Sequence, residues 1–91
     1  MNKYKIALIK TQGCESCSIM AENIETAVAQ TKRDVEVVEY NRRDLPKEYL
    51  KQEKIKDFPT TLFMVNDIIK YKAVGSYPSA VVLRWIDIHF T

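Results

Sequence analysis

The strongest constraint on the fold is a change of apolar period within the first half of the chain. The run KYKIALIKT, residues 3–11, is short, apolar and rich in isoleucine, which favours a buried strand over a helix. From Glu15 to about Lys32 the apolar residues recur at i, i+3, i+4 and i+7 and form one helical stripe. The valine-rich run DVEVVEYN, residues 34–41, predicts a second strand. This spacing implies a parallel strand pair joined by a right-handed crossover.

The second half of the chain predicts a short helix, a hairpin and a terminal helix. In residues 42–57 we expect a helix that Asp44 caps and in which Pro46 occupies the first turn. Strands are expected at residues 60–66 and 68–74, and a tight turn at Asn66–Asp67 makes them an antiparallel hairpin. Gly75 ends this pattern, and from about Pro78 the apolar residues return to helical spacing.

The element order β-α-β-α-β-β-α predicts the fold class. It is accounted for by an α/β fold with a four-stranded mixed sheet and helices on both faces. The length of 91 residues fits one domain, and we expect residues 1–91 to form it. The apolar share of 46% and the charged share of 29% are ordinary for a soluble globular domain, so we expect neither disorder nor low complexity.

Charge and hydropathy argue against two classes of partner. The net charge of +2 is too small to indicate nucleic acid. The basic pairs Lys32–Arg33 and Arg42–Arg43 are interleaved with acidic residues, so we interpret them as solvated surface rather than as phosphate-binding patches. No stretch approaches the ~20 apolar residues that cross a bilayer, and the start of the chain lacks the features of a signal peptide. We expect a cytoplasmic protein with no membrane partner.

The chain has only two cysteines, Cys14 and Cys17, and both lie where the first predicted helix begins. In the cytoplasm a close cysteine pair is more often catalytic or metal-binding than structural. The i, i+3 spacing places both sulfurs on one helix face, close enough for a disulfide.

The two sulfurs have different predicted environments at the start of the helix, and we expect different roles for them. Free N–H groups and the helix dipole favour the thiolate form of Cys14, while the carboxylate of Glu15 opposes it. Cys17 belongs to the apolar stripe and should be the less exposed sulfur. We therefore predict that Cys14 is the nucleophile and that Cys17 resolves the mixed disulfide.

Two other interpretations of the pair stay open. The cysteines could be buried and inert, or they could bind a metal ion. Zinc usually takes four protein ligands, or three and a water, and the only histidine is His89 at the far end of the last helix. We therefore predict no metal site within one chain, and a site shared between two chains stays open.

Pro59 in KDFPTTLF precedes a predicted strand, where a proline can start the strand but cannot lie in a central ladder. Together with C-E-S-C and the element order, it makes nearly the whole chain resemble the thioredoxin-like family, in a small form close to glutaredoxins. The resemblance also includes Val74–Gly75 before the last helix. In that family the proline is cis and packs beside the cysteines, and the residue before it offers backbone groups to an extended substrate.

The resemblance implies a thiol–disulfide oxidoreductase that reduces protein disulfides, with the Cys14–Cys17 disulfide as its redox group and no other cofactor. It implies protein disulfide substrates, a reductase or small thiol as electron donor, and a monomer. The residues it assigns to substrate binding are Phe58, Pro59 and Thr60, and those that modulate the cysteines are Gly13, Glu15 and Ser16.

The chain also departs from the family pattern. Thioredoxins typically have Trp before the first cysteine and Gly-Pro between the two, where this chain has Gly13 and Glu15–Ser16. The position of the buried aspartate of thioredoxins would fall near Leu8 in this chain. Glutaredoxins have Gly-Gly and then Asp near the last helix for glutathione binding, whereas this chain has G-S-Y-P at residues 75–78. The extra N-terminal strand and helix of full thioredoxins are expected to be absent.

Two further functions fit such a fold. A binding or adaptor module would use the Phe58–Pro59 surface without turnover, and a metal carrier would use the two thiols. Cys17 argues for the oxidoreductase, because an adaptor needs no resolving thiol.

Overall fold

A four-stranded sheet organises the chain. The computed structural model describes residues 3–91. The elements in chain order are β1 (Tyr4–Lys10), α1 (Glu15–Gln30), β2 (Val35–Asn41), the 3-10 turn η1 (Arg42–Asp44), α2 (Lys47–Gln52), β3 (Thr60–Val65), β4 (Ile68–Val74) and α3 (Ser79–His89). The strand order is β2-β1-β3-β4; β1 is parallel to β2 and antiparallel to β3, and β3 is antiparallel to β4. The predicted mixed sheet is confirmed.

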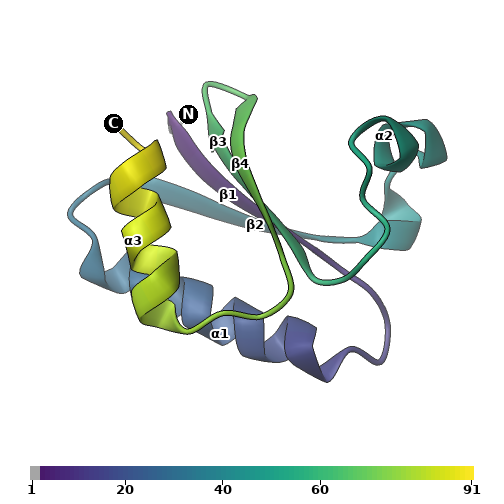
Figure 1. The fold of residues 1–91 in the computed structure, drawn as a ribbon, viewed down its shortest axis with the longest axis horizontal. Helices are drawn as coiled ribbons and strands as arrows, with labels where there is room; N and C mark the ends of the chain where they lie inside the picture. Colours follow the sequence, from purple (N-terminus) through teal and green to yellow (C-terminus); the bar gives the residue numbers. More distant parts are fainter. Residues whose placement is uncertain (1–2) are drawn as a thin grey trace.

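The two faces of the sheet are covered differently. Helices α1 and α3 lie on one face and the short α2 lies on the other, so helices flank both faces as predicted (Figure 1). Successive residues of β1 alternate between two hydrophobic clusters: Ile6 and Leu8 pack in the cluster under α1 and α3, and Ala7 and Ile9 pack in the cluster near α2. All four are buried, as expected for a central strand with both faces covered.

The β3–β4 hairpin has the two-residue turn that the sequence predicted. Asn66 and Asp67 have φ of 49° and 67°, the left-handed backbone that a tight turn between twisted strands requires. Asparagine and aspartate tolerate this conformation better than other residues with side chains. A register shift beside Phe63 and Met64 leaves Lys70 of β4 without a partner residue on β3, so the outer strand carries a bulge.

The start of α2 differs from the prediction. Pro46 is the N-cap residue and no side chain caps the helix, so the assignments of Asp44 as the cap and of Pro46 to the first turn are wrong. Asp44 instead lies in η1, which closes when the Leu45 N–H donates to the carbonyl of Arg42. A residue that precedes proline favours an extended backbone, so Leu45 separates the turn from the helix.

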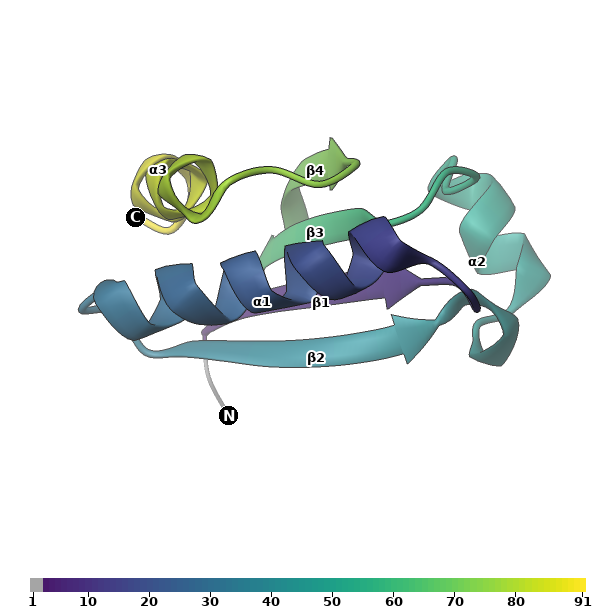
Figure 2. The ribbon, with the colours of Figure 1, turned by 90° about the horizontal axis from the view of Figure 1, so that it is seen from below.

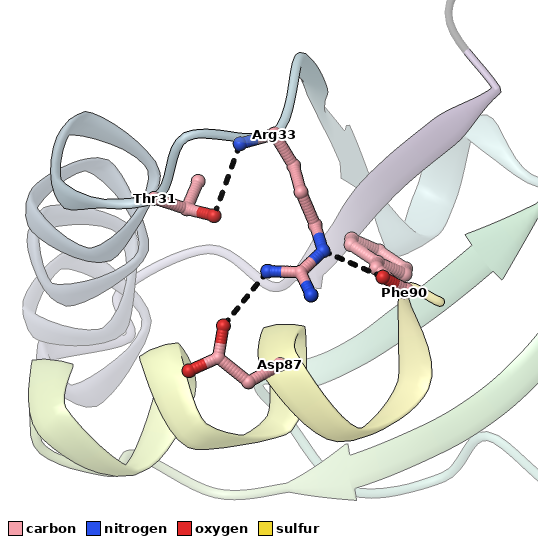
Figure 3. A network of polar contacts seen from close by, with 4 residues as sticks. All are labelled: Thr31, Arg33, Asp87 and Phe90. Atoms are coloured by element: carbon pink, nitrogen blue, oxygen red, sulfur yellow. Dashed lines mark hydrogen bonds and ion pairs between the residues drawn. The ribbon is translucent and has the colours of Figure 1, made fainter.

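Arg33 fastens the end of α3 to the segment that enters β2 (Figure 3). Its Nε donates to the carbonyl oxygen of Phe90 at 2.6 Å, and its Nη1 lies 2.8 Å from Oδ1 of Asp87. Phe90 is fully buried and stacks on Tyr4 with ring centroids 4.9 Å apart. The interpretation of Arg33 as part of a solvated basic pair is therefore wrong, because it holds the end of the core in place.

Within residues 3–91, no helix combines the length and the hydropathy that a membrane crossing requires.

Candidate active site

The ends of all four strands meet at one edge of the sheet. Lys10 lies opposite Asn41, Ile9 lies opposite Thr60, and Thr60 lies opposite Val74. In Figure 2 the arrowheads of β1, β2 and β4 point toward the same end, which is where α1 begins. The register therefore brings four segments that are distant in sequence to one place, namely residues 11–14, 42–44, 58–59 and 75.

Gly13 and Cys14 turn the chain from β1 into α1. Gly13 has φ of +68°, a backbone conformation that favours glycine. Lack of space is not the reason, because a Cβ added there would meet no atom within 4 Å. Cys14 is the N-cap residue of α1, with φ −105° and ψ 102°. Its Sγ accepts a hydrogen bond from the N–H of Cys17 at 3.1 Å. A sulfur atom thus takes the place that a Ser or Asp oxygen usually has at a helix start.

The two cysteines form a disulfide, with their Cα atoms 5.2 Å apart. Cys17 is only 2% exposed, whereas Cys14 is partly exposed. The hydroxyl of Ser16 lies 3.4 Å from the Cys14 Sγ. A depression of about 540 Å³ opens beside the pair and is lined by Lys10, Thr11, Gln12, Gly13, Cys14, Glu15, Cys17, Ser18 and Asn41. Cys14 is therefore the sulfur that an external molecule reaches first.

Phe58, Pro59 and Thr60 lie at the same end of the sheet but do not line this depression. The Phe58–Pro59 peptide bond is cis. The Pro59 carbonyl accepts from the Gly75 N–H at 2.9 Å, and the Thr60 hydroxyl donates to the Asp57 carbonyl at 2.6 Å. Among the described residues, no hydrogen bond joins these three residues to the cysteines.

Comparisons with known proteins identify the architecture but no close relative. No family model and no curated protein sequence matches the chain. Solved thioredoxin structures match nearly all of it. Thioredoxin-2 of the malaria parasite, described as a component of its protein secretion machinery, matches with a TM-score of 0.81 and 11% identity, over 97% of this chain and 84% of the other. The chain has the thioredoxin fold.

Two more structures of this fold agree. A mutant thioredoxin from Halobacterium salinarum gives a TM-score of 0.82 at 17% identity, over 99% of this chain and 77% of the other. Chloroplastic thioredoxin z gives 0.80 at 19% identity, over 98% of this chain and 80% of the other. At these identities the likeness concerns the fold, and the chemistry of the site must be argued from this chain's own residues.

One loop of this thioredoxin fold is fastened by contacts that the sequence did not predict. The N–H of Tyr77 donates to the Met20 Sδ at 3.4 Å, and the Asn23 amide donates to the Tyr77 carbonyl at 2.8 Å. The Tyr77 hydroxyl donates to the Val74 carbonyl at 2.8 Å. The loop after β4 is thereby held against α1, and Gly75 is held where its N–H meets Pro59. Asn23 is a half-buried polar residue beside the buried Ile24 of α1, and such a residue was a signal for this contact.

Among residues 3–91, no Asp or Glu side chain is buried. Leu8, near which the family resemblance places an aspartate, is fully buried. Its register partner on β3 is Thr61, which is also fully buried and whose hydroxyl has no hydrogen-bond partner.

The described residues give no support to a metal site. Between Lys3 and Thr91, no group of three or more His, Cys, Asp or Glu residues is arranged to hold a metal ion. The ring of His89 stacks on Tyr71 with centroids 4.5 Å apart, and this histidine is partly buried.

Proposed function

We propose that the protein is a thiol–disulfide oxidoreductase that reduces disulfides of other proteins, with Cys14 as the nucleophile and Cys17 as the resolving cysteine. The observation that carries this proposal is the geometry of the pair. A partly exposed sulfur accepts a hydrogen bond at the start of α1, and its bonded partner is buried one turn further along. The thioredoxin fold supports it as analogy.

In the reduced protein the Cys14 thiolate is stabilised by the N–H of Cys17, by the hydroxyl of Ser16 and by the dipole of α1. It attacks one sulfur of the substrate disulfide. The substrate S–S bond breaks, its other sulfur leaves as a thiolate and takes a proton from water, and a mixed disulfide forms.

Cys17 completes the reaction. It loses its proton and attacks the Cys14 Sγ, which forms the Cys14–Cys17 disulfide and releases the second substrate sulfur as a thiol. Two electrons pass to the substrate, and the protein becomes oxidised. A reductase or a small thiol then reduces the disulfide, so no further cofactor is needed. Because the dithiol must be regenerated, the activity suits a reducing compartment such as the cytoplasm.

The substrate segment is proposed to lie along Phe58–Pro59–Thr60 in extended form. This segment leads into β3 at the same sheet end as Cys14, and the bond between Gly75 and Pro59 fixes it relative to β4. Phe58 is the one partly exposed residue of the three, and an extended chain that pairs with its backbone would bring the disulfide over the nucleophile. The protein is proposed to act as a monomer.

The test is reduction of insulin disulfides, with thioredoxin reductase and glutathione supplied separately as electron donors. Cys14→Ser should abolish turnover. Cys17→Ser should leave alkylation of Cys14 intact and accumulate mixed disulfides with the substrate. Faster alkylation of Cys17 than of Cys14 in the reduced protein would reverse the roles, and binding without turnover in the unaltered protein would favour an adaptor.

A further inference from the structure

The two basic pairs of the sequence have different surroundings in the structure. Arg33 forms an ion pair with Asp87 and donates a hydrogen bond to the Phe90 carbonyl at the end of α3. Arg42 and Arg43 form the exposed start of η1, and neither makes an ion pair within residues 3–91. Two guanidinium groups are thus free of carboxylate partners in this part of the molecule.

Arg43 lies close to the segment before the cysteines, and Arg42 lies close to the proposed substrate segment. The Nη1 of Arg43 lies 3.5 Å from the side-chain oxygen of Gln12, which lines the depression beside Cys14. The guanidinium of Arg42 lies 5.8 Å from the ring centroid of Phe58, the residue before Pro59. Asn41, directly before them, also lines the depression. The arginines therefore stand between residues 11–13 and the proposed substrate segment.

Among the described residues, the other charged side chains near the depression do not form ion pairs with Arg42 or Arg43. Lys10 is paired with Glu39 at 2.8 Å, so these two charges offset each other. Asp44 follows the arginines in η1 without an ion pair to either. Glu15 lies on the opposite wall, in the first turn of α1. Glu15 thus lines the depression at α1, and the exposed arginines of η1 lie just outside its lining, next to Asn41 and Gln12.

We propose that Arg42 and Arg43 select substrate proteins in which acidic residues flank the reactive disulfide. This inference rests on the proposed function. Guanidinium groups bind carboxylates through two parallel hydrogen bonds, and exposed arginines that lack an internal partner are available for this. Because exposed ion pairs are individually weak, we expect the two together to raise kcat/KM about fivefold. The preference should weaken in high salt, which screens exposed charges.

The experiment uses three disulfide peptides that differ only in the residues next to the disulfide, which are Glu, Gln or Lys. With dithiothreitol as the donor, kcat/KM should fall in that order. The ratio between the Glu and Gln peptides should drop close to one in R42Q/R43Q and should largely persist in R42K/R43K, which keeps the charges. The control is K32Q/K70Q, which removes two exposed lysines, one between α1 and β2 and one in β4, and should keep the ratio.

Three results would overturn the inference. The first is equal turnover of the three peptides by the unaltered protein. The second is a loss of preference in K32Q/K70Q as large as in R42Q/R43Q, which would assign the effect to net charge alone. The third is a ratio between the Glu and Gln peptides in R42Q/R43Q that equals the ratio of the unaltered protein. The proposed function stands in all three cases. If the protein reduces neither insulin nor any peptide, the proposed function fails and this inference falls with it.

Discussion

Ser16→Ala should raise the pKa of the Cys14 thiol. The Ser16 hydroxyl lies 3.4 Å from the Cys14 Sγ, and it is the one side chain that contacts this sulfur by a hydrogen bond among the described residues, apart from the disulfide itself. In the reduced protein it can donate to the thiolate, and its loss favours the protonated form. A hydrogen bond to a charged group contributes roughly 1.5–3 kcal/mol when short and buried. This one is long and partly exposed, so we expect about 0.7–1.4 kcal/mol, or about 0.5–1 pKa unit.

The measurement is a titration of thiolate absorbance in a Cys17→Ser background, where only Cys14 reports. Alkylation by iodoacetamide below the pKa should slow by a factor of about three to ten. Ser18→Ala is the matched control, because Ser18 is exposed in the same helix and makes no hydrogen bond to the sulfur in the described structure. A pKa in Ser16→Ala equal to that in Ser18→Ala, or lower, would refute the argument that the hydroxyl stabilises the thiolate.

Two further predictions concern stability and use denaturant unfolding. Arg33→Ala should lower the free energy of unfolding by about 1–2 kcal/mol, because it removes the bond to the Phe90 carbonyl and a partly exposed ion pair with Asp87; an equal loss in Lys32→Ala would contradict a specific role for Arg33. Thr61→Val should raise the free energy of unfolding by about 1 kcal/mol, because the buried hydroxyl has no partner, whereas Thr60→Val should lower it by about 1 kcal/mol through loss of the bond to Asp57. Similar losses in both threonine variants would show that the Thr61 hydroxyl is satisfied.

Structural elements that depend only on neighbouring residues could be predicted from the sequence. The periods of β1, α1 and β2 and the turn at Asn66–Asp67 are local patterns, and the structure has each element within a few residues of its expected bounds. The start of α2 was wrong because the effect of Pro46 on the backbone overrode the capping preference of Asp44.

The site was predictable only in part for the same reason. Cys14 and Cys17 lie three residues apart, so their position at the start of α1 follows from local spacing. Arg33 and its partner Phe90 are 57 residues apart, and Asn23 and Tyr77 are 54 apart. The position of η1 beside the cysteines depends on the register of β1 with β2. No local pattern carries such information, because it arises only when the sheet is assembled.

The central place of β1 has a consequence for synthesis on the ribosome. This strand is made well before β3, which pairs with it, and α3, which covers it. At ~5–20 residues per second, the 55 residues from Lys10 to Val65 take on the order of 3–11 s to emerge. During that time the buried residues of β1 have no complete core to enter. Lys5 and Lys10 bracket its buried run, and charges in these positions discourage nascent chains from associating before the sheet can close.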